Sequence, residues 1–267
     1  NRYKGMLALN YEMGDAMRLL NGVEYAYDDA RTRGDKDVAS NQFFPNDSNR
    51  AHDKLSSDNM AAFSEFSWDS PWANLTAGFR VDKNKYAGWS YLPRLGLTRV
   101  FGDCHTKLLV SKAFRAPLLS HISSNTDIKP EWSLASEIEV GYKLSESVFA
   151  SANLFNVDIH DPIVYKTDTV NGETLDSYKN TGRTGTRGLE LELRTRHARG
   201  WATLGYAYYG ALHHGEENAA YTVSGQNGAH IAFARHKLNL LASLNVTRQF
   251  AVSPRNTREV VSVRSRV

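Results

Sequence analysis

The chain has 267 residues, of which 41% are hydrophobic and 23% are charged, and its mean hydropathy is −0.48; on these numbers alone it resembles one or two soluble domains. The formal net charge is only +3 and basic residues are scattered among acidic ones, which excludes the electrostatic footprint of a nucleic-acid-binding protein. No run of about eighteen or more apolar residues occurs, which excludes a transmembrane helix but leaves a transmembrane β-barrel open, because barrel strands alternate apolar and polar residues.

Period-two alternation dominates the chain, and helical periodicity is almost absent. The alternating segments are about ten residues long and are bounded by Gly, Asp, Asn, Ser and Pro. In chain order, their apolar positions are Leu75, Ala77, Phe79 and Val81; Ile138, Val140, Tyr142 and Leu144; Leu189, Leu191 and Leu193; and Leu238, Leu240, Ala242, Leu244 and Val246. Strands of this length exceed the five or six residues usual in soluble sheets and match the roughly nine to eleven of a tilted transmembrane strand.

Short turns alternate with long loops between these segments. The predicted turns lie at Gly14-Asp15, 69–72, Gly102-Asp103, 145–147, 197–200 and 247–249, and the predicted loops at 30–55, 83–90, 115–133, 166–176 and 212–233. Short turns on one rim and long loops on the other are typical of outer-membrane barrels. We therefore predict an all-β fold, an antiparallel up-and-down transmembrane β-barrel that is partial, with about 12 strands. Residues 1–253 are expected to form this partial barrel domain, and residues 254–267 an irregular tail.

The alternation also predicts which side chains meet lipid. We expect Leu189, Leu191, Leu193, Leu238, Leu240 and Leu244 to face the bilayer and Glu190, Glu192, Arg194 and Asn239 to face the lumen. A charge facing lipid at mid-membrane costs about 2 to 4 kcal/mol, so these charged groups are expected to face the lumen, where that cost is avoided.

Several motifs then occur in a consistent order. Ala113-Phe114-Arg115-Ala116-Pro117 is followed by the segment Asn125 to Glu131 (NTDIKPE), by Glu137 to Tyr142 (EIEVGY), and later by Tyr178 to Gly182, Thr186 to Glu192 and His236 to Leu240. Together with Ala77 to Asp82 and Pro93 to Leu97, these motifs resemble the barrel of the TonB-dependent outer-membrane receptors over about residues 56 to 246. The family box has Pro-Asp-Leu where this chain has Thr126-Asp127-Ile128.

The resemblance implies a receptor in the outer membrane that takes up a scarce nutrient, with iron-siderophore or haem as the expected ligand. It implies a barrel of 22 strands with a plugged lumen, for which 267 residues are too few, so we expect a fragment without the plug and with strands missing at both ends. The implied partners are the lipid bilayer and lipopolysaccharide, a small-molecule nutrient, and the TonB energy-coupling complex acting through the missing plug. No cofactor, no metal site, no catalytic residue and no nucleic-acid partner is expected.

Two other function classes remain open on the sequence. An outer-membrane barrel hydrolase would need a Ser-His pair within hydrogen-bond reach at the membrane rim. A soluble β-sandwich binding module would turn its apolar strand faces inward to a core.

Ligand contacts are expected on the long-loop rim, because the short turns are too small to form a pocket. The candidate ligand-binding residues are Arg115, His121, Tyr86, Trp89, Asn125, His213 and His214. Arg115 has the guanidinium that suits an anionic chelate, although an ion pair with a wall carboxylate on an adjacent strand, such as Glu137 or Glu139, is the plainer interpretation. His121 is the only imidazole between the two boxes and corresponds to the expected haem ligand, although a polar surface residue is the plainer interpretation. His213 and His214 point oppositely on an extended chain, which argues against a shared metal site.

Overall fold

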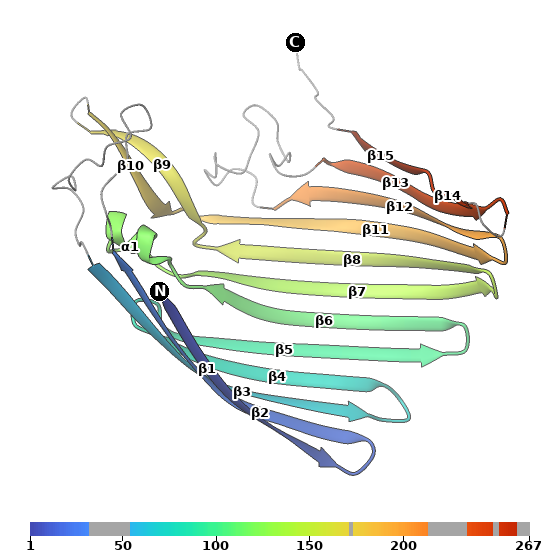
Figure 1. Ribbon diagram of the computed structural model, residues 1–267, viewed down its shortest axis with the longest axis horizontal. Helices are drawn as coiled ribbons and strands as arrows, with labels where there is room; N and C mark the ends of the chain where they lie inside the picture. Colours follow the sequence, from blue (N-terminus) through green and yellow to red (C-terminus); the bar gives the residue numbers. More distant parts are fainter. Residues whose placement is uncertain (32–53, 171–172, 213–233, 248–250, 261–267) are drawn as a thin grey trace.

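The computed structural model describes residues 1–31, 54–170, 173–212, 234–247 and 251–260. These residues form one large curved antiparallel sheet, with a short helix and a two-stranded hairpin at one end (Figure 1). The elements are β1 Arg2–Met13, β2 Met17–Arg31, β3 Lys54–Asp69, β4 Asn74–Asn84, β5 Gly88–Phe101, β6 Cys104–Arg115, α1 Leu119–Ser124, β7 Glu131–Ser145, β8 Val148–His160, β9 Ile163–Val170, β10 Glu173–Asn180, β11 Arg183–His197, β12 Gly200–Ala211, β13 His236–Asn245, β14 Ala251–Val252 and β15 Arg255–Val260. No helix among the described residues is long and apolar enough to cross a bilayer.

The main sheet is an up-and-down meander. Strands β1 to β8 pair in sequence order, β8 then pairs with β11, and β11 to β13 continue the order, with β14 and β15 both on the far edge of β13. The sheet has 13 strands, and hairpin β9–β10 is a separate two-stranded sheet inserted between β8 and β11. The all-β, partial-barrel prediction is confirmed, and the soluble sandwich is ruled out because the sheet is a single curved layer rather than two facing ones.

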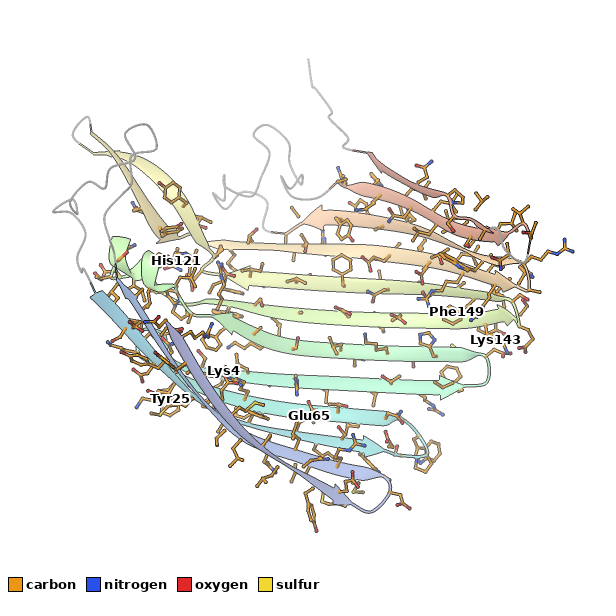
Figure 2. All side chains as sticks on the ribbon, in the orientation of Figure 1. Lys4, Tyr25, Glu65, His121, Lys143 and Phe149 are labelled. Atoms are coloured by element: carbon orange, nitrogen blue, oxygen red, sulfur yellow. The ribbon has the colours of Figure 1, made fainter. Side chains whose placement is uncertain are left out.

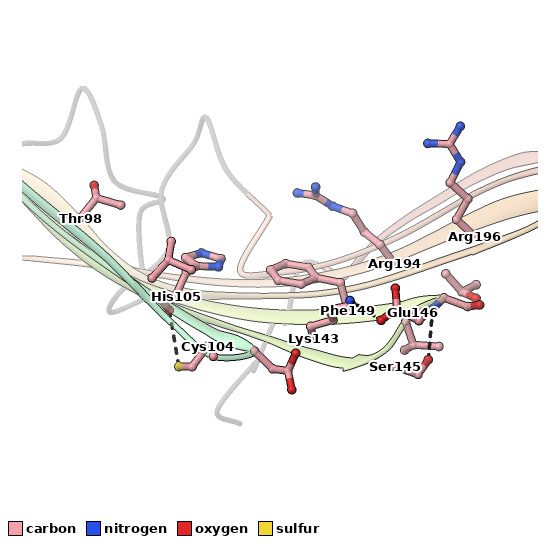
Figure 3. Close-up of a pocket in the computed structure, with 15 residues that line it drawn as sticks. Thr98, Cys104, His105, Lys143, Ser145, Glu146, Phe149, Arg194 and Arg196 are labelled. Atoms are coloured by element: carbon pink, nitrogen blue, oxygen red, sulfur yellow. Dashed lines mark hydrogen bonds and ion pairs between the residues drawn. The ribbon is translucent and has the colours of Figure 1, made fainter. Parts of the chain in front are cut away.

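The two faces of the sheet differ as the alternation predicts. Figure 3 shows His105, Phe149 and Arg194 on the concave side. Since residues i and i+2 share a face, Glu190 and Glu192 lie on that side as well, and the leucines between them lie on the convex side. Leu191 is 41% exposed and Leu244 is 55% exposed, so the convex face is an apolar surface without a protein cover among the described residues. The predicted division of these residues between two opposite faces is confirmed: the leucines expected to meet lipid share the convex face, and the charged residues expected in the lumen share the concave face.

Aromatic side chains mark both ends of the apolar belt on the convex face. At the short-turn end, the Arg99 guanidinium lies 5.9 Å from the Trp72 ring and 5.6 Å from the Phe101 ring. At the other end, the Lys83 and Lys112 ammonium groups lie 5.4 Å and 4.8 Å from the rings of Trp89 and Trp132. Paired aromatic girdles flanking an apolar band are typical of a β-sheet that spans a bilayer.

The short turns lie at the end of the sheet opposite α1 and the hairpin (Figure 1). The connections after β1, β3, β5, β7 and β11 fall where the sequence predicts short turns. The predicted loop 83–90 is wrong: β4 and β5 are joined by residues 85–87 alone. The side-chain oxygen of Asn84 accepts the amides of Tyr86 and Ala87, both at 3.0 Å, and Gly88 adopts φ 69°, which together close a tight turn.

Two other predicted irregular segments are strands. The predicted loop 166–176 is wrong, because β9 and β10 pair through it as a hairpin. The irregular tail predicted from residue 254 is wrong for Arg255–Val260, which pairs with β13 in the register His236 to Val260 through Leu241 to Arg255. This segment has little apolar alternation, and its pairing satisfies backbone groups on the edge of β13 that would otherwise lack partners.

Candidate functional site

The loop end of the sheet carries a small packed unit, here called the rim platform: α1, residues 125–130 after it, hairpin β9–β10, the start of β3 and the β4–β5 turn. Its core consists of Leu55, Ile122, Ile128 and Ile163, with Tyr86, Leu119 and Tyr178 packed against them. These side chains come from five separate segments, so the unit joins the base of the long loops into one body.

The chain enters the platform at the end of β6. The strand ends at Arg115, and Pro117 is buried and has no amide to continue a ladder, which favours a break before α1. The amides of His121 and Ile122 donate to the Leu118 carbonyl at 2.9 and 3.1 Å, and the Asn125 amide donates to the His121 carbonyl at 2.9 Å. The helix therefore begins and ends within the short segment between the two sequence boxes.

Arg115 anchors the base of this loop. Its guanidinium donates to Glu131 Oε2 at 2.7 Å, and the same carboxylate oxygen accepts the Ile163 amide at 3.1 Å. The expected ion pair with a carboxylate on an adjacent strand is confirmed, but the partner is Glu131, which stands opposite Arg115 in the β6–β7 register. The named examples Glu137 and Glu139 are wrong, because they lie farther along β7. The Arg115 side chain is nevertheless 51% exposed at the rim, so part of its guanidinium remains accessible.

His121 lies inside the platform. Figure 2 labels His121 at the loop end of the sheet, within α1. The residue is 7% exposed, its Nδ1 accepts the Leu118 amide at 3.3 Å, and its ring centroid lies 4.2 Å from that of Tyr178. Burial, and secondarily the positive charge of Arg115, lowers the pKa of His121 below its usual 6.5. A neutral, buried imidazole that accepts a backbone hydrogen bond supports the loop fold.

Asn125 also holds the platform together. Its Nδ2 donates to the Tyr178 carbonyl at 2.9 Å, and its Oδ1 accepts the Asp127 amide at 3.0 Å. Tyr86 packs on the platform core and donates its hydroxyl to the Ser56 carbonyl at 3.1 Å.

The structure therefore brings Arg115, His121, Tyr86 and Asn125 to one unit and separates Trp89 from them. Trp89 is 60% exposed beside Lys83 in the convex-face girdle, and His213 and His214 lie outside the described residues. No group of three or more potential metal ligands gathers within the described part of the chain.

Sequence reasoning missed the hairpin residues that complete the platform. Asn180 accepts the Lys129 amide at 2.7 Å and donates to the carbonyls of Lys129 and Asp161 at 3.0 and 2.7 Å. Tyr165 is 56% exposed and meets Tyr178 edge-on at 5.2 Å. The segment Tyr178 to Gly182 was identifiable as a motif, but its pairing with Lys129 depends on a contact about fifty residues away in sequence.

Away from the rim platform, a hollow of about 540 Å³ lies at the short-turn end of the concave face (Figure 3). There His105 Nε2 and Glu139 Oε1 lie 2.8 Å apart. The His105 ring stacks on the Phe149 ring, with 5.4 Å between the ring centroids. The Arg194 guanidinium lies 5.8 Å from the Phe149 ring. None of the predicted ligand-binding residues lines this hollow.

Comparison with known proteins is consistent with this geometry. The family model described as TonB dependent receptor-like, beta-barrel, matches residues 1–257. No curated protein matches the chain by sequence. Among solved structures, the siderophore receptor PirA of Acinetobacter baumannii superposes with a TM-score of 0.71 at 18% identity, covering 97% of this chain and 43% of that one.

Two further structures have the same fold. A variant of the ferric enterobactin receptor PfeA of Pseudomonas aeruginosa, in complex with enterobactin, superposes with a TM-score of 0.73 at 16% identity, covering 96% of this chain and 41% of that one. The copper transporter OprC superposes with a TM-score of 0.65 at 15% identity, covering 91% and 40%. The chain spans less than half the length of each of these structures.

Proposed function

Because the chain belongs to the TonB-dependent receptor β-barrel family, we propose that it forms part of the wall and outer rim of a receptor that imports a ferric siderophore across the outer membrane. The family and its structural neighbours are receptors and transporters rather than enzymes, which argues against the hydrolase alternative. Energy would come from TonB acting on a plug segment outside these 267 residues.

The observation that carries the choice of substrate class is the exposure of Arg115 beside the buried His121. The half-exposed Arg115 side chain at the rim suits an anionic metal chelate, which its guanidinium would contact through charge-assisted hydrogen bonds. An axial haem ligand has to present its imidazole to the iron, whereas His121 is packed against Tyr178 and bonded to the Leu118 amide. Two of the structural neighbours, PirA and PfeA, are siderophore receptors, which agrees with this choice.

The test uses the full-length receptor in a strain that lacks it, grown on ferric siderophores, haem, cobalamin or copper as the limiting nutrient. We expect growth on an anionic ferric siderophore, and Arg115→Ala to weaken its binding roughly tenfold or more, as loss of a charge-assisted hydrogen bond of about 1.5 to 3 kcal/mol would.

A matched variant separates ligand contact from loop support. Glu131→Gln removes the carboxylate charge that pairs with Arg115 but leaves the guanidinium in place, so siderophore binding should be kept. Equal losses in Arg115→Ala and Glu131→Gln would assign Arg115 to loop structure alone. If haem alone restores growth, and His121→Ala abolishes that growth, the ligand of the receptor is haem and not a siderophore.

A further inference from the structure

Two polar residues interrupt the apolar belt on the convex face. Asn21 on β2 and Ser64 on β3 stand directly opposite each other in the β2–β3 register. The registers from β6 back to β3 place Glu65 on the concave side with His105. Ser64 is the next residue along β3, so Ser64 and its partner Asn21 both lie on the convex side.

This polar pair lies deep in the belt rather than at its margin. On the convex side of β3, Ser64 is four residues from Trp68 at the short-turn end and six residues from Asp58 at the loop end. These separations are roughly 14 and 20 Å along the strand, at about 3.4 Å per residue. A serine or asparagine side chain is too short to span either distance, so neither polar group reaches the membrane surface.

The hydrogen-bonding groups of the pair are not satisfied within the sheet. Asn21 and Ser64 are both exposed, and neither side chain has a hydrogen-bond partner in the described part of the chain. Acyl chains offer no donor or acceptor at this depth, and a polar group left unpaired in hydrocarbon is unfavourable. Polar side chains that face the membrane interior in this way commonly bond to a neighbouring protein segment.

A hollow of about 660 Å³ adjoins the pair on its loop side. Ala62 lines it, two residues from Ser64, and stands between Val23 and Val81 in its row. Val23 and Met60, which also line the hollow, are each 55% exposed. The surface around the polar pair is therefore uneven, and side chains of a second protein surface can enter the hollow beside Ala62.

We propose that this surface, Asn21, Ser64 and the hollow at Ala62, is the contact between two copies of the protein in the outer membrane. Copies that insert in the same direction are related by a two-fold axis along the membrane normal, so a residue meets its counterpart at the same depth. A carboxamide both donates and accepts, so Asn21 of one copy can bond twice to Asn21 of the other. The inference rests on the outer-membrane location and not on which nutrient is carried.

The test measures the monomer–dimer equilibrium of the full-length receptor in lipid vesicles, by energy transfer between donor-labelled and acceptor-labelled copies. Each hydrogen bond between membrane segments strengthens association about threefold or more, so Asn21→Leu, which removes two, should weaken dimerisation roughly tenfold. Asn239→Leu is the matched control, because it makes the same change on the concave face, and it should leave dimerisation unchanged.

A second measurement separates the contact from a role in folding. Asn21→Leu removes a polar group from the lipid-facing side, so the variant should resist urea at least as well as wild type. In native outer membranes, a short bis-maleimide should link Ser64→Cys into a homodimer but not Leu191→Cys, both in a Cys104→Ser background.

A wild-type receptor that stays monomeric in vesicles would overturn the proposal, as would equal dimerisation of wild type and Asn21→Leu, or equal losses in Asn21→Leu and Asn239→Leu. Lower urea resistance of Asn21→Leu would assign Asn21 to the fold of the single chain. Linkage of Ser64→Cys to a protein of another mass would assign the surface to a different partner and contradict the second copy.

Discussion

At the scale of single residues, Gly141 on β7 is a position on the concave face where the neighbouring side chains leave no room for a larger residue. A Cβ at Gly141 would fall on the rings of His105 and Phe149, which cover the glycine from the two neighbouring strands. We predict that Gly141→Ala destabilises the folded protein by about 1 to 3 kcal/mol, the usual cost of overpacking. Urea unfolding in lipid vesicles measures it, with Gly205→Ala as the control because nothing lies within 4 Å of a Cβ there. Equal effects of the two substitutions would show that the ring stack does not constrain Gly141.

His121 predicts a pH dependence of the rim platform. Its pKa is lowered in the folded state, so below about pH 6.5 the unfolded loop binds more protons and the platform loses stability as the pH falls. Hydrogen exchange at the Ile122 and Asn125 amides, corrected for intrinsic rates, should speed up as the pH drops from 7 to 5. His121→Gln should remove this dependence. Unchanged protection in wild type over that range would refute it.

The sequence placed Arg115 and His121 at the rim correctly but could not supply their contacts. The partner of Arg115 depends on the β6–β7 register. The burial of His121 depends on Tyr178, which the sequence placed in a strand motif but which belongs to a hairpin whose residues 166–176 the sequence suggested were a loop. Residue type limits the chemistry of a position, while contacts made across fifty residues decide whether that position supports the fold or meets a ligand.

At the scale of elements, hairpin β9–β10 depends on Asn180 to stay on the platform. Its three hydrogen bonds reach Lys129 and Asp161, so Asn180→Ala leaves one amide and two carbonyls without these partners. We predict a local destabilisation of about 1 to 3 kcal/mol, seen as faster hydrogen exchange in α1 and β9–β10 but not in β11 or β12. Ser123→Ala, which removes one exposed hydrogen bond to Ser120, is the control. Faster exchange spread evenly over the whole sheet would contradict a local role.

Long elements were predictable and short ones were not. Strands such as β7 and β11, at 15 residues each, carry enough alternation to set both their type and their faces. Helix α1, at 6 residues, is shorter than two helical turns and leaves no periodic signal. Hairpin β9–β10 has apolar residues at Ile163 and Val164 but no sustained period-two alternation, and strand β15 is polar, so backbone pairing defines both elements more than an apolar pattern does.

At the scale of the whole molecule, the account rests on a single claim: the convex face of the sheet lies in lipid and the concave face does not. The alternation alone predicts this, since it places Leu191 and Leu240 on one face and Glu190 and Asn239 on the other. The claim also places Arg115, which shares the concave face with His105, away from lipid, and so the proposed function depends on it.

Fluorescence quenching by brominated lipids tests that claim most directly. Single cysteines at positions 190, 191, 239 and 240, each in a Cys104→Ser background, would carry a polarity-insensitive fluorophore in the membrane-inserted protein. We predict strong quenching at positions 191 and 240 and little at 190 and 239. Strong quenching at 190 and 239 with little at 191 and 240, or equal quenching at all four, would contradict the membrane-spanning arrangement.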